Sequence, residues 1–201
     1  MYARVNIIFA QSDKIDASIA DIERSARAKV ETTRGNRGLT TLVDRRAGVI
    51  VAMSYWDEPS HSSEAPLTQA RENAVAAAGG DLVVENYEVA LAERLSAPAP
   101  GAVVQMTPVQ LEPPRVADGL ALLHREVLPQ LRMGPGFCSA DVLIDRHSGN
   151  GIFVTAWEHG DDAARAGTIL DQLREEVAEQ VGAKFFRAET YVIVGASAPL
   201  N

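Results

Sequence analysis

A strand-turn-strand pattern that occurs twice constrains the fold of this 201-residue chain more than any other feature. In both copies Asp-Arg-x-x-Gly is followed, eight residues after the glycine, by a tryptophan and an acidic residue. The copies are Asp44–Glu58 and Asp145–Glu158, and they hold the only two tryptophans of the chain. A polar turn with glycine between two apolar, β-branched segments is typical of a β-hairpin. Each half of the chain is therefore predicted to contain a hairpin that ends in tryptophan.

The segments around the two hairpins also recur. Apolar residues in the first half follow the spacing of one helix face, and each has a counterpart 101 positions later. The first set is Ile15, Ile19, Ile22, Ala26 and Val30, and the second is Val116, Leu120, Leu123, Val127 and Leu131. Two further helices are expected at about 64–78 and 163–181, and Pro129 is expected to kink or end its helix early. The matched spacing predicts an internal duplication rather than two unrelated segments.

The order of elements predicts an α+β fold made of two ferredoxin-like β-α-β-β-α-β repeats. The repeats are expected at residues 1–95 and 102–201, joined by a short, stiff linker at 96–101 that contains two prolines. The strands are apolar on both faces, so each sheet needs a cover besides its own helices. We therefore expect two four-stranded antiparallel sheets packed face to face within one chain, as a pseudo-dimer. Pairing of each sheet with a second chain is the alternative.

Composition excludes several classes of partner. The net charge is −8 and neither half is basic, which argues against nucleic acid. No apolar segment approaches the roughly 18 residues that span a bilayer, and the N-terminus does not resemble a signal peptide, so no membrane partner is expected. Cys138 is the only cysteine, so no intramolecular disulfide can form. These features are typical of a cytoplasmic protein.

Short motifs recur in the same order in both halves, and they resemble the motifs of a known family. In the first half the motifs are Gly35–Gly38, Val43–Gly48, Tyr55–Glu58 and Glu85–Val89, and in the second they are Pro135–Phe137, Ile144–Gly149, Ala156–Glu158 and Glu189–Tyr191. Each half resembles an antibiotic biosynthesis monooxygenase (ABM) domain of the dimeric α/β-barrel superfamily. The resemblance implies two sheets packed into a barrel, usually from two chains, with a small-molecule cavity between sheet and helices. A homo-oligomer is compatible with it. Members include cofactor-independent oxygenases, haem-degrading enzymes and proteins without an assigned activity.

Strand alternation places small residues beside each tryptophan. Trp56 shares a strand face with Ile50, Ala52 and Ser54, and Trp157 shares one with Gly151, Phe153 and Thr155. Small side chains beside a large ring leave room for a ligand, so Trp56 and Trp157 are candidates for the wall of a binding site. The alternative is a core aromatic whose N–H is satisfied within the protein.

The resemblance also implies roles for polar residues. Asn6 matches an asparagine that lines the cavity of related oxygenases and haem-degrading enzymes, where its amide could stabilise a substrate anion or dioxygen. The predicted catalytic residues are Asn6 and Trp56, and the predicted substrate-binding residues are Arg37, Ala52, Ser54, Tyr87 and Trp157. Asn6 as a structural polar residue and Tyr87 as a core residue are the alternatives.

The second half departs from these residues, with Gln105 at the position of Asn6 and Cys138 at the position of Arg37. It also has Phe153 at the position of Ala52, so the first half is expected to hold the larger cavity and the activity.

No metal or cofactor is predicted. The haem-degrading relatives carry an iron-ligating histidine on the helix after the tryptophan, and residues 64–78 and 163–181 contain none. No cysteine or histidine cluster suggests zinc. Two functions remain. One is a cofactor-independent monooxygenase that acts on a small aromatic or quinol-like compound. The other is a non-catalytic module of the same fold, for small-molecule binding or self-association.

Overall fold

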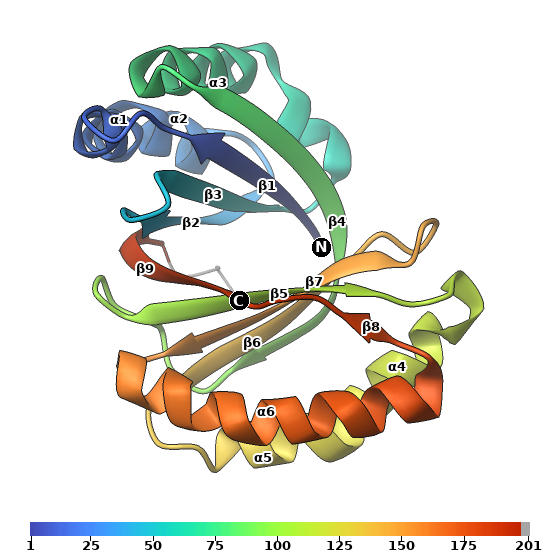
Figure 1. The fold of residues 1–201 in the computed structure, drawn as a ribbon. Coiled ribbons are helices and arrows are strands. Elements are labelled where there is room, and N and C mark those ends of the chain that lie inside the picture. Colours follow the sequence, from blue (N-terminus) through green and yellow to red (C-terminus); the bar gives the residue numbers. More distant parts are fainter. Residues whose placement is uncertain (198–201) are drawn as a thin grey trace. The chain divides into compact units, whose positions relative to one another are not determined.

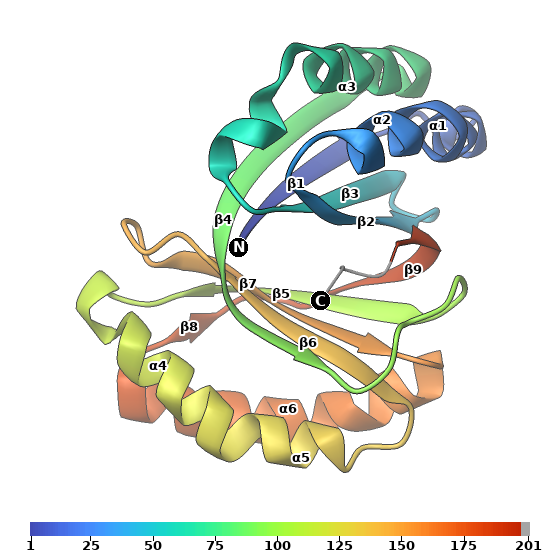
Figure 2. The ribbon, with the colours of Figure 1, turned by 180° about the vertical axis from the view of Figure 1, so that it is seen from behind.

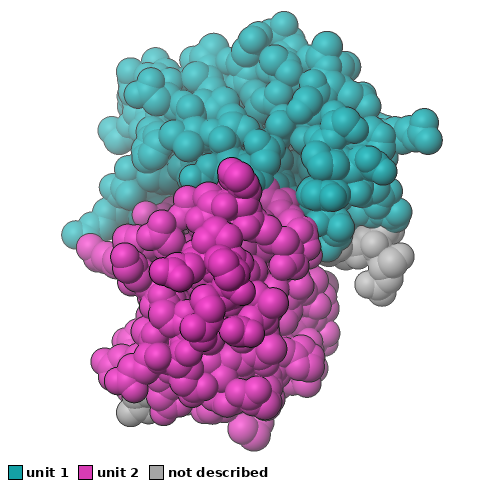
Figure 3. Space-filling model, turned by 90° about the vertical axis from the view of Figure 1, so that its right-hand side faces the viewer, with its two compact units in different colours: residues 1–86, 192–201 teal, residues 87–191 magenta. Residues whose placement is uncertain are grey.

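The computed structural model describes residues 1–197, apart from the side chains of residues 169 and 172. The chain divides into two compact units (Figure 3). Unit 1 is Met1–Asn86 with the C-terminal segment from Val192, and unit 2 is Tyr87–Tyr191. Two strands therefore contribute residues to both units. These are β4 (Asp81–Arg94) and β9 (Glu189–Ala196).

Unit 1 is an antiparallel sheet with its helices on one face (Figure 1). The strand order is β4-β1-β3-β2-β9, with the first part of β4 and the last part of β9. The strands are β1 (Tyr2–Phe9), β2 (Asn36–Asp44) and β3 (Val49–Trp56). The helical segments are α1 (Ile15–Asp21), η1 (Ile22–Ala26), α2 (Arg27–Thr32), the short 3₁₀ helix η2 (Pro59–Ser63) and α3 (Ala65–Ala78).

Unit 2 has the same arrangement, and its helices also cover one face of an antiparallel sheet (Figure 2). The strand order is β4-β6-β7-β5, with the last part of β4, and β5 also pairs with β8 and β9. The strands are β5 (Val103–Gln110), β6 (Phe137–Ile144), β7 (Asn150–Trp157) and β8 (Lys184–Phe185). The helical segments are η3 (Pro113–Arg115), α4 (Val116–Leu122), η4 (Leu123–Val127), α5 (Leu128–Arg132) and α6 (Gly160–Val181). The predicted α+β class with ferredoxin-like order is confirmed.

The two predicted hairpins are present as β2–β3 and β6–β7. The turn glycines Gly48 and Gly149 have positive φ angles of 71° and 76°, which glycine adopts without steric cost. Each turn lies against the end of the unit's first strand: the carbonyl of Gly48 accepts a 2.7 Å hydrogen bond from the N–H of Ala10, and that of Gly149 accepts a 2.9 Å bond from Leu111. A side chain at either glycine would collide with that backbone. The positive φ angle and the close backbone contact therefore both require glycine at these turns.

A π-helical turn interrupts the first helix of each unit. In unit 1 it is η1, in unit 2 it is η4, and the two lie 101 positions apart. Of the two expected effects of Pro129, an early end of the helix is wrong, because α5 continues to Arg132, and a kink stays a prediction. The N–H of Leu128 bonds to the carbonyl of Leu123, five residues earlier, and Pro129 then lies in the first turn of α5. The helix therefore accepts proline directly after the π-helical turn, where the hydrogen-bond spacing is wider than in an α-helix.

Each unit has its own apolar core between sheet and helices. The core of unit 1 joins the helix residues Ile15, Ile19 and Ile22 to Ile8 and Ile50 on the strands. The core of unit 2 is larger and includes Phe137, Phe153 and Trp157. Within residues 1–197, no helix has the length and apolar character that crossing a bilayer requires.

Candidate functional site

A cavity of about 50 Å³ lies in unit 1 between the sheet and the helices. Four of the residues predicted from the sequence line it: Asn6, Ala52, Ser54 and Trp56. The remaining wall is mainly apolar and comes from η1, α2 and α3, including Ile22, Ala26, Val30, Leu67, Ala70 and Ala74. The volume is several times the roughly 10–15 Å³ that one water molecule needs, so the space accepts a small polar group.

The register of β1 and β3 explains why these residues meet. Asn6 lies directly opposite Ala52, and Arg4 lies opposite Ser54. Opposite residues in an antiparallel pair point to the same face, as do residues two positions apart on one strand. The alternation seen in the sequence therefore places Asn6, Ala52, Ser54 and Trp56 on one face of the sheet.

Asn6 is buried, with 8% of its surface exposed. Its Nδ2 donates a 3.2 Å hydrogen bond to the carbonyl of Ala52, which fixes the orientation of the amide. Its Oδ1 is buried without a hydrogen-bond partner. A buried acceptor without a partner costs free energy, so this oxygen is suited to accept a hydrogen bond from a ligand.

Trp56 is fully buried, and its polar atom is already used. Its indole Nε1 donates a 2.9 Å hydrogen bond to Oγ of Ser54. In unit 2 Trp157 makes the equivalent bond, 3.1 Å long, to Oγ1 of Thr155. Trp56 therefore offers a cavity ligand the surface of its ring and not its N–H.

Two arginines that the sequence analysis did not select also line the cavity, Arg4 from β1 and Arg71 from α3. Nη1 of both side chains donates to the carbonyl of Ser62, at 2.5 Å from Arg4 and 3.2 Å from Arg71. Burial lowers the pKa of Arg4, and the charge of Arg71 lowers it further. A signal was present in the sequence: Arg4 alternates with Asn6, and Arg71 falls beside Leu67, Ala70 and Ala74 on the apolar face of its helix.

Three predicted binding residues do not line this cavity. Arg37 lies on the surface and forms an ion pair with Asp57, whose pKa is lowered by hydrogen bonds from Arg37. Tyr87 and Trp157 belong to unit 2. Trp157 has no exposed surface and packs edge to face against Phe137, with 5.3 Å between the ring centroids.

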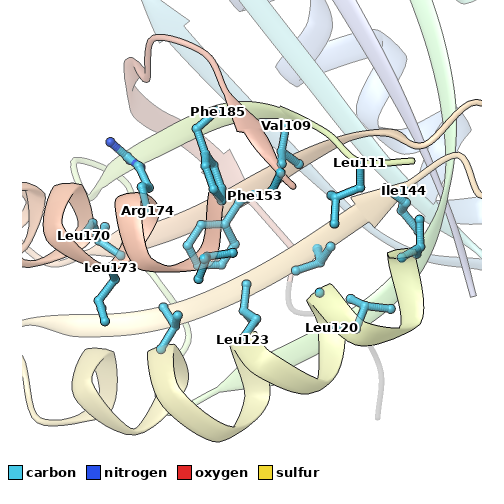
Figure 4. A pocket seen from close by; sticks show the side chains of 16 residues that line it. Val109, Leu111, Leu120, Leu123, Ile144, Phe153, Leu170, Leu173, Arg174 and Phe185 are labelled. Atoms are coloured by element: carbon cyan, nitrogen blue, oxygen red, sulfur yellow. The ribbon is translucent and has the colours of Figure 1, made fainter. Parts of the chain in front are cut away.

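Unit 2 has a cavity of about 60 Å³ of different character. Its lining is apolar apart from Arg174, and it includes Phe153 and Phe185 (Figure 4). Neither Gln105 nor Trp157 lines it. We expected the larger cavity in the first half, and this is wrong: the two volumes are similar, with the slightly larger one in unit 2. The reason is that the space in unit 2 opens away from Trp157, toward the helices α4 and α6 and the strand β8.

The part of the chain that the structure describes contains no group of three or more histidine, cysteine, aspartate or glutamate side chains placed to hold a metal. Cys138 is buried on β6, and burial raises the pKa of its thiol. The polar and aromatic groups that line the site in unit 1 are an amide, an indole, two serines and two guanidinium groups.

Comparison with known proteins places the chain in a family. No family model matches it. It is 34% identical over 167 residues to the uncharacterised protein Rv2557 of Mycobacterium tuberculosis H37Rv, which covers 82% of this chain and 75% of that protein. The chain belongs to the Rv2557 family. A second Mycobacterium tuberculosis protein, Rv2558, is 28% identical over 187 residues, covering 92% of this chain and 79% of that protein.

Solved structures share the fold of this Rv2557 family member at low sequence identity. A proposed monooxygenase from Fusobacterium nucleatum superposes with a TM-score of 0.74 at 10% identity, covering 98% of this chain and 94% of that one. An anthrone oxidase-like protein gives a TM-score of 0.69 at 13% identity, covering 98% and 93%. A ferredoxin-fold protein from Listeria monocytogenes related to antibiotic biosynthesis monooxygenases gives 0.58 at 14% identity, covering 95% and 94%. The fold of the chain is thus that of ABM-like proteins.

Proposed function

We propose that this protein is a cofactor-independent monooxygenase that acts on a small aromatic or quinol-like compound in the cavity of unit 1. The observation that carries the proposal is the convergence of Asn6, Ala52, Ser54 and Trp56 on one cavity. The fold shared with monooxygenase-like proteins supports it. No nucleic acid or membrane partner is part of the proposal, and the cytoplasm is the proposed location.

The proposed chemistry needs an electron-rich substrate that reduces dioxygen itself. Conversion of a ring CH₂ group and O₂ to a carbonyl and water balances without a further reductant. The protein's part is positioning and stabilisation of the substrate anion. The ring of Trp56 would lie against the aromatic substrate, and Oδ1 of Asn6 would accept a hydrogen bond from a substrate hydroxyl. The second N–H of the Asn6 amide remains available to a developing oxyanion.

We further propose that the chain is a tandem duplication, with ABM-like repeats at 1–95 and 102–201, a linker at 96–101 and the activity confined to the first repeat. Three features that recur 101 positions apart support the duplication: the π-helical turn, the hairpin glycine, and the bulge near the start of the strand that pairs with the tryptophan strand. The different linings of the two cavities support the division of roles.

The size of the unit 1 cavity favours a second candidate, a non-catalytic binding module. A space of about 50 Å³ is smaller than the roughly 300–1,000 Å³ of typical ligand sites, so a polycyclic substrate requires side chains to move. A module of this kind would bind a small molecule or a second copy of the chain without turnover.

Oxygen uptake distinguishes these functions. Purified protein, treated with a chelator, is mixed with anthrone or with a substituted hydroquinone in an oxygen electrode cell. The proposal expects protein-dependent uptake with one O₂ consumed per carbonyl formed from anthrone. Asn6→Ala should reduce the rate on the order of 100-fold, because small misplacements in a site have effects of that size. Gln105→Ala is the matched control in unit 2 and should retain the rate. Equal losses in the two variants would contradict the division of roles, and no uptake with any substrate of the panel would favour the binding module.

A further inference from the structure

Two cationic side chains meet at the unit 1 cavity without a neutralising carboxylate. Arg4 donates through Nε to Oδ1 of Asn86 at 2.8 Å and through Nη2 to Oγ of Ser63 at 3.0 Å, besides its bond to the carbonyl of Ser62. Arg71 donates to that carbonyl and, at 2.8 Å, to Oγ1 of Thr68. All of these acceptors are neutral oxygens.

The combination of partial burial and no ion pair sets Arg4 and Arg71 apart, because the other described arginines outside the ion pairs, Arg24, Arg34, Arg46 and Arg187, are exposed. Within the described residues, ten other arginines form ion pairs with aspartate or glutamate: Arg27, Arg37, Arg45, Arg94, Arg115, Arg125, Arg132, Arg146, Arg165 and Arg174. Carboxylates are abundant, since the chain has 27 acidic and 19 basic residues. The partly buried pair thus has no carboxylate partner although the chain has an excess of acidic residues, which makes an anion from outside the chain a candidate partner.

The electrostatic environment of Arg4 and Arg71 also favours binding of an anion. Burial lowers the pKa of both arginines, which shows that each charged form is disfavoured at this position. The charge of Arg71 disfavours that of Arg4 further, and the one carboxylate that acts on the pair is Glu72, which favours the charge of Arg71 without forming an ion pair with it. Two like charges that share one carbonyl acceptor repel each other, and an anion placed between them would relieve that repulsion.

The pair also has hydrogen-bonding capacity left. A guanidinium group carries five N–H donors, of which Arg4 uses three and Arg71 uses two. A carboxylate accepts bonds from two guanidinium groups at once, because each oxygen has two lone pairs. The cavity of about 50 Å³ has room for the carboxylate, and the ring of the ligand requires the side-chain movement described above.

We propose that the unit 1 cavity recognises an aromatic carboxylate, with the carboxylate held between Arg4 and Arg71, the ring against Trp56, and a ring hydroxyl donated to Oδ1 of Asn6. This inference names the substrate class of the proposed oxygenase and rests on that function only for what happens to the ligand after binding. The binding step needs neither oxygen nor turnover.

Anaerobic calorimetric titration at fixed ionic strength tests the inference. The probes are benzoate, 4-hydroxybenzoate and 1-naphthoate, each compared with its neutral amide. The wild-type protein should bind at least one acid, and bind it at least about tenfold more tightly than the amide, because a charge-assisted hydrogen bond is worth roughly that factor. Arg71→Gln and Arg4→Gln should each weaken binding about tenfold or more, and Arg71→Lys should retain part of the affinity. Arg45→Gln is the matched control: it removes one positive charge from unit 1, at an exposed ion pair with Asp16, and should leave the affinity unchanged.

A measurement without ligand guards against a variant that fails to fold. Relief of the repulsion should raise the melting temperature of Arg71→Gln above that of the wild type, whereas Arg45→Gln should show no such increase. The inference is overturned if no acid binds the wild type, if amides bind as tightly as acids, or if both Arg→Gln variants bind like the wild type. Acid binding without oxygen uptake would leave the inference standing and remove the oxygenase. Turnover of neutral quinols that is unaffected by Arg71→Gln would support the oxygenase and overturn the inference of carboxylate recognition.

Discussion

The indole Nε1 of Trp56 donates a hydrogen bond of 2.9 Å to Oγ of Ser54, two residues earlier on the same strand. Both side chains are buried, at 1% and 4% exposure. Trp157 and Thr155 repeat the relationship in unit 2. Residues two apart on a strand share a face, so a hydroxyl at this position can always reach the indole of the following tryptophan. The pairing fixes the ring that forms one wall of the candidate site.

Removal of that hydroxyl should destabilise the protein. In Ser54→Ala the indole N–H of Trp56 stays buried without an acceptor, which costs about 1–3 kcal/mol. Thr155→Val should cost a similar amount through Trp157, whereas Ser54→Thr keeps a hydroxyl and should cost less. Urea denaturation followed by tryptophan fluorescence measures the difference. A Ser54→Ala midpoint equal to that of the wild type would show that water replaces the hydroxyl.

The π-helical turns lead to a prediction about proline. Ala28 lies 101 positions before Pro129, in the first turn of α2 and directly after the π-helical turn η1. Unit 2 accepts Pro129 at the equivalent place without ending its helix, so Ala28→Pro should lower the free energy of unfolding by less than about 1 kcal/mol. Ala76 in α3 is also exposed but lies past the first turn. Ala76→Pro should therefore cost about 3 kcal/mol. Equal losses on thermal unfolding would contradict this account.

Much of the fold could be predicted from the sequence, because local patterns determine it. The hairpins follow from glycine turns between apolar segments, and the helix stripes follow from the spacing of residues such as Ile15 and Ile19. Alternation was also sufficient to place Ala52, Ser54 and Trp56 on one strand face, whereas Asn6 was placed in the cavity by the resemblance to ABM domains. The inferences from spacing and alternation need only the period of a strand or a helix.

The remainder depends on contacts between segments far apart in the sequence. The helix periodicity places Arg71 on the apolar face of α3, but it does not show that α3 packs near β1 and brings Arg71 to Arg4. The division of β4 and β9 between the units depends on which strands they pair with, and β9 pairs with β2 about 150 residues earlier. The volume of a cavity depends on how all of its side chains pack. The presence of Phe153 at the position equivalent to Ala52 was therefore not enough to predict which unit has the larger cavity.

The ion pair between Glu23 and Arg27 should make stability depend on pH. Burial alone would raise the pKa of Glu23, but hydrogen bonds from Arg27 and Thr41 outweigh it, and the pKa is lowered. A carboxylate with a lowered folded-state pKa contributes stability above its unfolded pKa of about 4.3, and that contribution is lost as the pH falls through the folded value. The wild type should thus lose more stability than Glu23→Gln between about pH 5 and pH 3. Parallel midpoints in urea at each pH would contradict the prediction.

The unpartnered side-chain oxygens of Asn6 and Gln105 should both reduce the stability of the protein. Only that of Asn6 is proposed to bind a ligand. Oδ1 of Asn6 and Oε1 of Gln105 are both buried without a hydrogen-bond partner. Leucine at either position removes the unpaired acceptor and buries apolar surface, which should outweigh the loss of the Asn6 bond to Ala52. Asn6→Leu and Gln105→Leu should therefore each raise the free energy of unfolding by about 1 kcal/mol, a rise of roughly 2–4 °C in melting temperature. Asn6→Leu should also abolish 4-hydroxybenzoate binding, because that oxygen is its proposed hydroxyl acceptor, whereas Gln105→Leu should retain it. A lower melting temperature for Asn6→Leu would mean that Oδ1 is satisfied by water in solution and is not held in reserve for a ligand.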